Sequence, residues 1–113
     1  MLIETEKNND VLIVRVKEKR LDARLAPEFR EALQAPVDGG IKKIALNLCE
    51  TDFIDSSGLG AIVSILKAMG SEGNIAICNS SGAVLQMFKL TRMDKIFAIF
   101  DSENNAVDSL VKD

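Results

Sequence analysis

Residues 51–67, TDFIDSSGLGAIVSILK, contain the group of side chains in this sequence that is best suited to chemistry. Asp55, Ser56, Ser57, Gly58 and Gly60 bring one carboxylate, two hydroxyls and two glycines together. They follow an apolar stretch and precede a helical pattern, so they stand at a strand-to-helix junction. Such a junction can bind a phosphate group, hold a nucleophilic serine, accept a covalent modification or simply cap the helix.

The residue types at the junction do not fit nucleotide binding. Gly58 and Gly60 begin like the dinucleotide-binding motif G-x-G-x-x-G, but Val63 occupies the position of the third glycine. The next strand ends in Cys78 and Asn79, where that motif needs an acid to bind the ribose. The phosphate-loop pattern G-x-x-x-x-G-K-[ST] is also missing. We therefore expect no nucleotide or other cofactor at this site.

A catalytic role for the serines is equally poorly supported. A nucleophile elbow has the pattern G-x-S-x-G, and Ile54 stands where the first glycine would precede Ser56. The sequence contains no histidine, so it lacks the commonest base for activating a serine and the commonest metal ligand. No cluster of Cys, Asp and Glu has metal-binding spacing. The sequence predicts no catalytic residue, no enzymatic activity and no metal site.

The helix that follows Asp55 is predicted to have an unusual outer face. Asp55 is a good N-cap, and capping by itself would explain part of the motif. At about 100° per residue, the stripe facing the core contains Leu59, Ile62, Val63, Leu66 and Met69. The opposite side, with Ser57 at its margin, carries Ser56, Gly60, Ser64 and Lys67. Exposed helix faces usually carry more charge, so this face is interpreted as a docking surface for another protein.

Ser56 lies at the rim of this face and at the positive end of the helix. Phosphorylation would add about −1.5 to −2 charges there. The helix N-terminus would tolerate the anion, whereas Asp55 and an acidic partner surface would be repelled by it. The geometry therefore predicts a phosphorylation switch at Ser56.

Composition indicates a soluble, globular chain that forms one domain over residues 1–113. Apolar residues make up 47% and charged residues 27% of the sequence. The net charge of −3 and the isoelectric point near 5.0 argue against nucleic-acid binding. We expect a cytoplasmic protein with no membrane partner, because no secretory signal or membrane-spanning stretch is visible. Cys49 and Cys78 each end a predicted strand and are interpreted as small core residues.

Strands and helices alternate after residue 40, which favours an α/β sheet with some parallel pairing. Strands are predicted at 11–16, 41–48, 74–78 and 95–100, and residues 2–6 are expected to pair with the first as a hairpin. Helices are predicted at 25–35, 56–69, 81–90 and 102–112. Ser81 and Ser102 are the expected N-caps of the last two helices. The last helix should bury a stripe formed by Ala106, Val107, Leu110 and Val111.

The stretch LNLCETDFIDSSGLGAIVSILK closely resembles the signature of STAS domains, and specifically of the bacterial anti-sigma factor antagonists. The likeness extends through LDARLAPEFREAL and AVLQMFKLTRMDKIFAIF to the closing helix. It implies a STAS fold, a mixed β-sheet of about five strands with about four helices largely on one side. It also implies a partner-switching regulator. In that family the dephosphorylated protein binds a GHKL-type serine kinase that doubles as an anti-sigma factor, and so frees the sigma factor.

The resemblance assigns roles to individual residues. It implies that the kinase phosphorylates Ser56 and that a PP2C-type phosphatase reverses the reaction. Asp55, Ser57, Gly58 and Gly60 would frame the phosphorylated serine and its docking helix, and Asp22 matches an acid on a neighbouring loop. Relatives often have the pattern G-x-L-D where this chain has Lys19-Arg20-Leu21-Asp22, and clients other than a sigma factor occur among relatives. The alternative is a STAS subunit of a membrane transporter complex, docked permanently and without phosphate.

Overall fold

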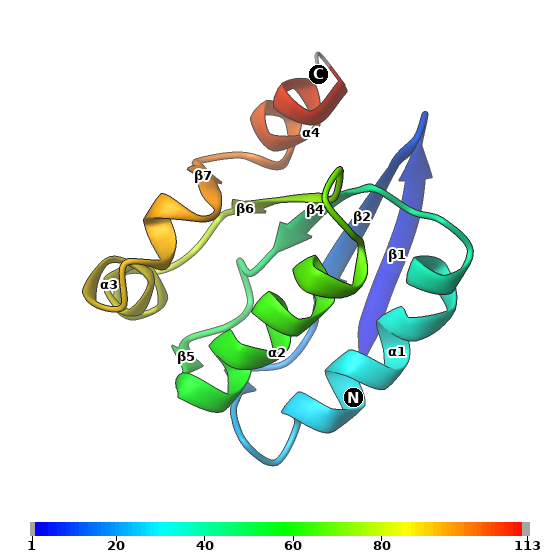
Figure 1. The fold of residues 1–113 in the computed structure, drawn as a ribbon. Coiled ribbons are helices and arrows are strands. Elements are labelled where there is room, and N and C mark those ends of the chain that lie inside the picture. Colours follow the sequence, from blue (N-terminus) through cyan, green and yellow to red (C-terminus); the bar gives the residue numbers. More distant parts are fainter. Residues whose placement is uncertain (1, 112–113) are drawn as a thin grey trace.

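A five-stranded mixed β-sheet forms the centre of the computed structural model, which describes residues 2–111 (Figure 1). Across this sheet the strands follow the order β1 (Ile3–Asn8), β2 (Val11–Val16), β4 (Lys43–Asn47), β6 (Asn74–Cys78) and β7 (Ala98–Phe100). β1 and β2 are antiparallel, and the other neighbouring strands are parallel. The β1–β2 pair confirms the predicted hairpin. Its turn places Asn9 at φ 58°, in the left-handed region that asparagine tolerates well.

The central strands are buried on both faces, as expected for parallel strands that helices cover on each side. In β2, Leu12, Val14 and Val16 belong to the larger core, whereas Val11 and Ile13 belong to a smaller core on the other face. The predicted strand at residues 11–16 is therefore confirmed, with apolar side chains on both of its faces. β4 and β6 follow the same pattern, because their inner residues are divided between the same two cores.

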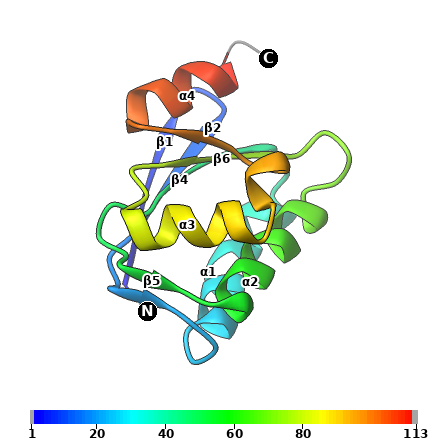
Figure 2. The same cartoon turned by 90° about the vertical axis from the view of Figure 1, so that its left-hand side faces the viewer.

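The helices are unequally divided between the faces of the sheet (Figure 2). Within the described residues, α1 (Ala26–Asp38), α2 (Ser56–Ala68) and α3 (Gly82–Leu90) cover the larger core, and α4 (Glu103–Val111) covers the smaller one. α1 and α2 lie side by side (Figure 1). The predicted arrangement, a mixed sheet with helices largely on one side, is therefore confirmed.

Arg15 fastens α4 to the sheet. Its Nε and Nη2 atoms donate hydrogen bonds of 2.9 and 2.8 Å to the two carboxylate oxygens of Glu103, the first residue of α4. Asn47 on β4 donates a third bond of 2.8 Å to the same carboxylate. The hydrogen bonds from Arg15, helped by that of Asn47, hold the pKa of Glu103 below its usual value despite partial burial.

A second, two-stranded parallel sheet lies at the start of α2. It consists of β3 (Arg20–Leu21) and β5 (Phe53–Ile54). Two residues are too few to produce a detectable alternation of apolar and polar side chains. No bounds were therefore predicted for either strand, although a strand was expected before the junction at Asp55. The pair matters for the site because it brings residues 20–25 beside the N-terminus of α2.

The structure corrects the prediction for the segment between α3 and α4. The strand expected at 95–100 begins only at Ala98, and a short 3₁₀ helix, η1 (Met93–Lys95), precedes it. Arg92 stands at the N-cap of η1 with φ 62°, a left-handed conformation that turns the chain sharply. Phe97 is buried, but Ile96 is 51% exposed.

Four smaller predictions are also corrected. Cys49 is exposed rather than a core residue, whereas Cys78 is buried as predicted, and burial raises its thiol pKa to about 12. Ser81 occupies the N-cap of α3 without a cap bond, because its hydroxyl donates to the Thr51 carbonyl instead. Val111 is exposed. α1 continues to Asp38, past the residues predicted for it.

The cap predicted for α4 is confirmed. Ser102 accepts a 3.1 Å hydrogen bond from the Asn105 amide.

Candidate protein-docking site

Asp55 fixes the start of α2 through both of its carboxylate oxygens. Oδ1 accepts a hydrogen bond of 2.9 Å from the backbone N–H of Gly58, the usual N-cap interaction. Oδ2 accepts a bond of 3.2 Å from the backbone N–H of Ala23, in the loop between β3 and α1. The predicted cap is therefore confirmed, and it does more than close the helix. One side chain ties the first turn of α2 to a loop more than thirty residues earlier in the chain.

Gly58 allows this close approach. It is buried in the first turn of α2, and a Cβ atom at this position would lie 2.2 Å from the Leu21 carbonyl oxygen. The same Cβ would lie 2.8 Å from Cγ1 of Ile54. Both contacts are shorter than real Cβ atoms tolerate, so only glycine lets α2 rest on β3. The place of Gly58 is thus inside the fold rather than on the exposed face.

The loop acid Asp22 lies next to Ala23 and is held by its own loop. Its Oδ1 accepts hydrogen bonds from the backbone amides of Arg24 (3.2 Å) and Leu25 (3.4 Å). Its Oδ2 accepts a bond of 3.3 Å from Nε of Arg20. Burial raises the pKa of the Asp22 carboxyl, but these hydrogen bonds outweigh it and leave the pKa below its usual value.

Arg20 has a second contact that no motif indicated. Its guanidinium lies over the Phe53 ring, 4.2 Å from the ring centroid, and the Phe53 side chain is 38% exposed. Such a cation–π contact is worth roughly 0.5–1 kcal/mol at an exposed position. Arg20 and Phe53 are paired residues of β3 and β5, so the stack follows directly from the small sheet.

The outer face of α2 has the composition that the helical periodicity predicted. The exposed residues of this face are Ser56, Ser57, Gly60, Ser64 and Lys67. No side chain of this set makes an ion pair with the rest of residues 2–111. The buried side of the helix is centred on Ala61, Ile62 and Ile65. Val63 and Leu66, which the wheel placed in the core stripe, are only half-buried.

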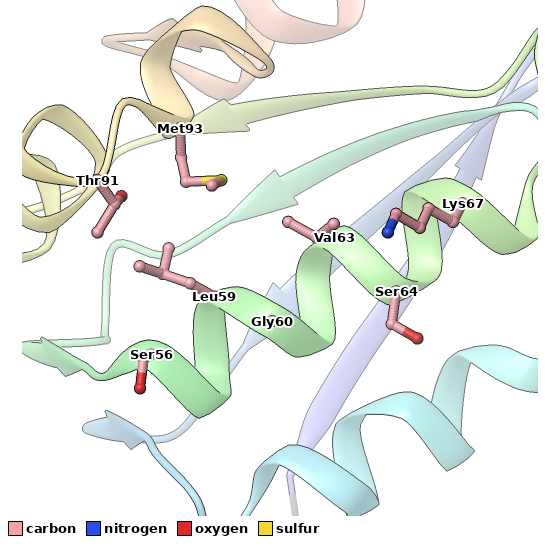
Figure 3. Close-up of a pocket in the computed structure, with 8 residues that line it drawn as sticks. All are labelled: Ser56, Leu59, Gly60, Val63, Ser64, Lys67, Thr91 and Met93. Atoms are coloured by element: carbon pink, nitrogen blue, oxygen red, sulfur yellow. The ribbon is translucent and has the colours of Figure 1, made fainter.

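A groove of about 470 Å³ runs along this face of α2. Figure 3 shows Ser56 at one end of the row and Lys67 at the other, with Gly60 and Ser64 between them. Leu59 and Val63 form the apolar wall on the α2 side. Thr91 and Met93 come from the chain after α3 and form the opposite wall (Figure 3).

The structure therefore gathers most of the predicted site residues in one place. Ser56, Gly60, Ser64 and Lys67 line the groove, while Asp55 and Asp22 build the framework below its first turn. Thr91 and Met93 were missed. They stand on either side of the turn at Arg92, whose left-handed backbone has no sequence signature, so no local pattern could have placed them beside α2.

No helix within residues 2–111 has the length and apolar character needed to cross a membrane. Over the same residues, no three side chains of His, Cys, Asp or Glu gather in a way that could hold a metal ion. The groove itself is lined by hydroxyls, apolar side chains and one lysine.

Comparison with known proteins gives consistent matches across almost the whole chain. Residues 3–106 match the STAS domain family model. An anti-sigma F factor antagonist from Paenibacillus polymyxa is 32% identical over 114 aligned residues, which cover 96% of this chain and 93% of the relative. An anti-sigma-B factor antagonist from Staphylococcus epidermidis is 30% identical over 98 residues, covering 86% of this chain and 90% of the relative.

One solved structure is similar to this chain in its fold as well as in its sequence. A crystal structure from Thermotoga maritima superimposes with a TM-score of 0.85 at 29% identity. The alignment covers 96% of this chain and 93% of that one. Since both chains are covered almost completely, the likeness concerns the whole arrangement of sheet and helices rather than a shared fragment.

Proposed function

Because this chain belongs to the STAS domain family of anti-sigma factor antagonists, we propose that it is a partner-switching regulator controlled at Ser56. In its dephosphorylated form it binds a GHKL-type serine kinase that also acts as an anti-sigma factor. Binding releases the sigma factor or another client of that kinase. Phosphorylation of Ser56 ends the interaction, and a PP2C-type phosphatase restores it.

The position of Ser56 is the observation that carries this proposal. Ser56 is the first residue of α2, it is exposed, and it borders the nearly uncharged groove. Its neighbours Gly60 and Ser64 add little bulk and no charge, which permits a partner surface to approach α2 closely. A phosphoryl group on Ser56 would stand at the edge of that contact.

The charge of the phosphoryl group would act differently on the chain and on its partner. Within the chain, the N-terminus of α2 carries a partial positive charge and accommodates an added anion. In the complex, an acidic partner group about 4 Å away would be repelled by about 1 kcal/mol in water and about 4 kcal/mol at an effective dielectric near 20. A micromolar complex, worth about 8 kcal/mol, would be lost in large part. The fold is retained while the binding is not.

Ser56 acts in this proposal as a substrate and not as a nucleophile. The chain has no histidine to take the proton of the hydroxyl, and the Asp55 carboxylate is engaged by two backbone amides. The kinase binds the ATP and supplies the catalytic base. The regulator supplies an exposed acceptor hydroxyl and a surface that the kinase recognises.

The test is to mix the protein with GHKL-type kinases from its own genome and ATP, and to map the phosphate by mass spectrometry. We expect modification of the wild type and of Ser57→Ala, and none of Ser56→Ala. Ser57→Ala is the matched control because it removes the neighbouring hydroxyl from the same turn. Calorimetric titration should show the dephosphorylated protein binding the kinase and the phosphorylated protein binding at least about tenfold more weakly. Stoichiometric phosphorylation of Ser56→Ala, or equal binding of both forms, would contradict the proposal. Equal binding of both forms would favour permanent docking that does not depend on phosphate.

A further inference from the structure

The groove beside α2 has features that a flat docking face does not need. Its walls are apolar, formed by Leu59 and Val63 on α2 and by Met93 on η1. Figure 3 shows the Met93 side chain extending from the opposite wall toward α2. Methionine is flexible and polarisable, and it adapts to the shape of an apolar side chain inserted beside it.

The charge of the groove is one-sided. Lys67 is the charged residue among those that line it, and no acid accompanies it there. Lys67 forms no ion pair with the other residues that the structure describes. A cation at the end of an otherwise uncharged groove is complementary to an acidic group on an occupant.

We infer that the groove receives one large apolar side chain of the partner between Val63 and Met93, and that Lys67 pairs with a carboxylate of the same partner segment. This inference rests on the proposed function, since the partner is the kinase that modifies Ser56. It adds what that function leaves open: the wall contributed by residues 91–93 becomes part of the interface. It also makes Lys67 a residue that selects partners by charge.

The two ends of the groove then have different tasks. Ser56, at the N-terminal end, carries the switch, and the apolar centre and Lys67 provide binding energy and specificity. An apolar side chain buried at the centre of an interface usually contributes more to affinity than the polar contacts around it. A relative with another residue in place of Met93 or Lys67 would therefore respond to a different kinase while keeping the same switch.

Methionine methyl signals test the inference on the unmodified chain. The sequence has four methionines, and Met69 is only 1% exposed in the core. This chain is labelled with [methyl-¹³C]methionine. The unlabelled kinase shown to phosphorylate Ser56 is then added without nucleotide. We expect the Met93 signal to shift or broaden and the Met69 signal to stay unchanged. Met93→Ala should bind at least about threefold more weakly, as expected for loss of an apolar contact at an interface centre.

Charge reversal tests the role of Lys67. Lys67→Glu should weaken kinase binding at least about tenfold. Lys89→Glu is the matched control, since Lys89 is an exposed lysine near the end of α3 and does not line the groove. It makes the same change in net charge and should alter the affinity less than about twofold. Carbodiimide cross-linking of the wild-type complex should join Lys67 Nζ to a carboxylate of the kinase.

The outcomes separate this inference from the function on which it rests. If the kinase phosphorylates Ser56 and binds the chain, but Met93 is unperturbed and Lys67→Glu binds normally, the groove is not the docking site and the proposed function stands. If no kinase of the genome binds the chain, both are overturned. If Lys67→Glu and Lys89→Glu weaken binding equally, the effect is one of overall charge, and Lys67 has no specific acidic partner.

Discussion

The carboxylate of Asp55 accepts a 3.2 Å hydrogen bond from the backbone amide of Ala23, and this bond joins the candidate docking helix to the loop before α1. The other oxygen of the same carboxylate caps α2 at Gly58. One side chain therefore ties the first turn of α2, which carries Ser56, to two parts of the backbone. A stability measurement can detect this double role.

Replacing Asp55 should cost more than the loss of an ordinary helix cap. Asp55→Ala removes the cap, worth about 0.5–2 kcal/mol, and also leaves the Ala23 amide without its acceptor. We expect the free energy of unfolding to fall by about 2–3 kcal/mol in urea denaturation. Asp52→Ala is the control, because the Asp52 carboxylate lies on the surface, 3.8 Å from Lys19 Nζ, and should change stability by less than about 0.5 kcal/mol. A loss no larger than that of an ordinary cap would show that the bond to Ala23 contributes nothing, and equal effects of the two substitutions would show that neither bond of Asp55 contributes.

The two glycines of α2 should respond oppositely to the same substitution. Gly58→Ala places a Cβ atom 2.2 Å from the Leu21 carbonyl oxygen, so α2 must move away from β3, at a cost of about 1–3 kcal/mol. Gly60→Ala meets no atom within 4 Å and replaces a poor helix former, which should stabilise the protein by up to about 1 kcal/mol. Urea midpoints measured on the two variants give the comparison. A stable Gly58→Ala variant would mean that α2 does not pack on β3 as described.

The ion pair between Arg15 and Glu103 should make stability depend on pH in the acid range. The folded pKa of Glu103 lies below the ordinary value of 4.5. Its stabilising contribution is therefore fully present above that value and is lost as the pH falls through the lower, folded pKa. Glu103→Gln should be less stable than the wild type at neutral pH, and the difference should shrink as the pH falls below 4.5 and through the lower, folded pKa. Glu72→Gln, which changes an exposed carboxylate between α2 and β6, is the control. A difference independent of pH would show that the charge of Glu103 is not what fastens α4.

Much of this architecture could be predicted from the sequence, because long elements with strong periodicity carry their own signals. The buried strand around Val14 and the exposed side of α2 around Gly60 are both of this kind. The failures occur where the outcome depends on distant partners. Cys49 follows a buried strand but lies beyond its end, and only the path of the chain exposes it. Met93 reaches the groove through the turn at Arg92, whose backbone conformation has no sequence signature.

The exposed residues of the site on α2 could be predicted from the sequence, but the contacts that position the first turn of α2 could not. The spacing of Ser56, Gly60 and Ser64 placed them on one face without any knowledge of tertiary structure. Gly58 belongs to the same motif, yet its requirement for glycine comes from the Leu21 carbonyl on another element. Sequence alone could not separate these two reasons for a glycine, because each depends on what stands opposite the Cβ position.

The final prediction uses Gly60 to separate binding from folding. The space around Gly60 is open, and it lies on the groove one turn after Ser56. Gly60→Glu should keep or slightly raise thermal stability, because glutamate is a much better helix former than glycine. It should nevertheless weaken kinase binding by at least about 1.4 kcal/mol, or about tenfold, because it puts bulk and negative charge into the contact. Ser56→Asp should act in the same direction but less strongly than phosphate, since it adds about one charge and less volume. Calorimetric titration of the dephosphorylated proteins, with melting curves as the check on folding, measures both effects. Full-strength binding by a folded Gly60→Glu variant would place the kinase elsewhere on the molecule.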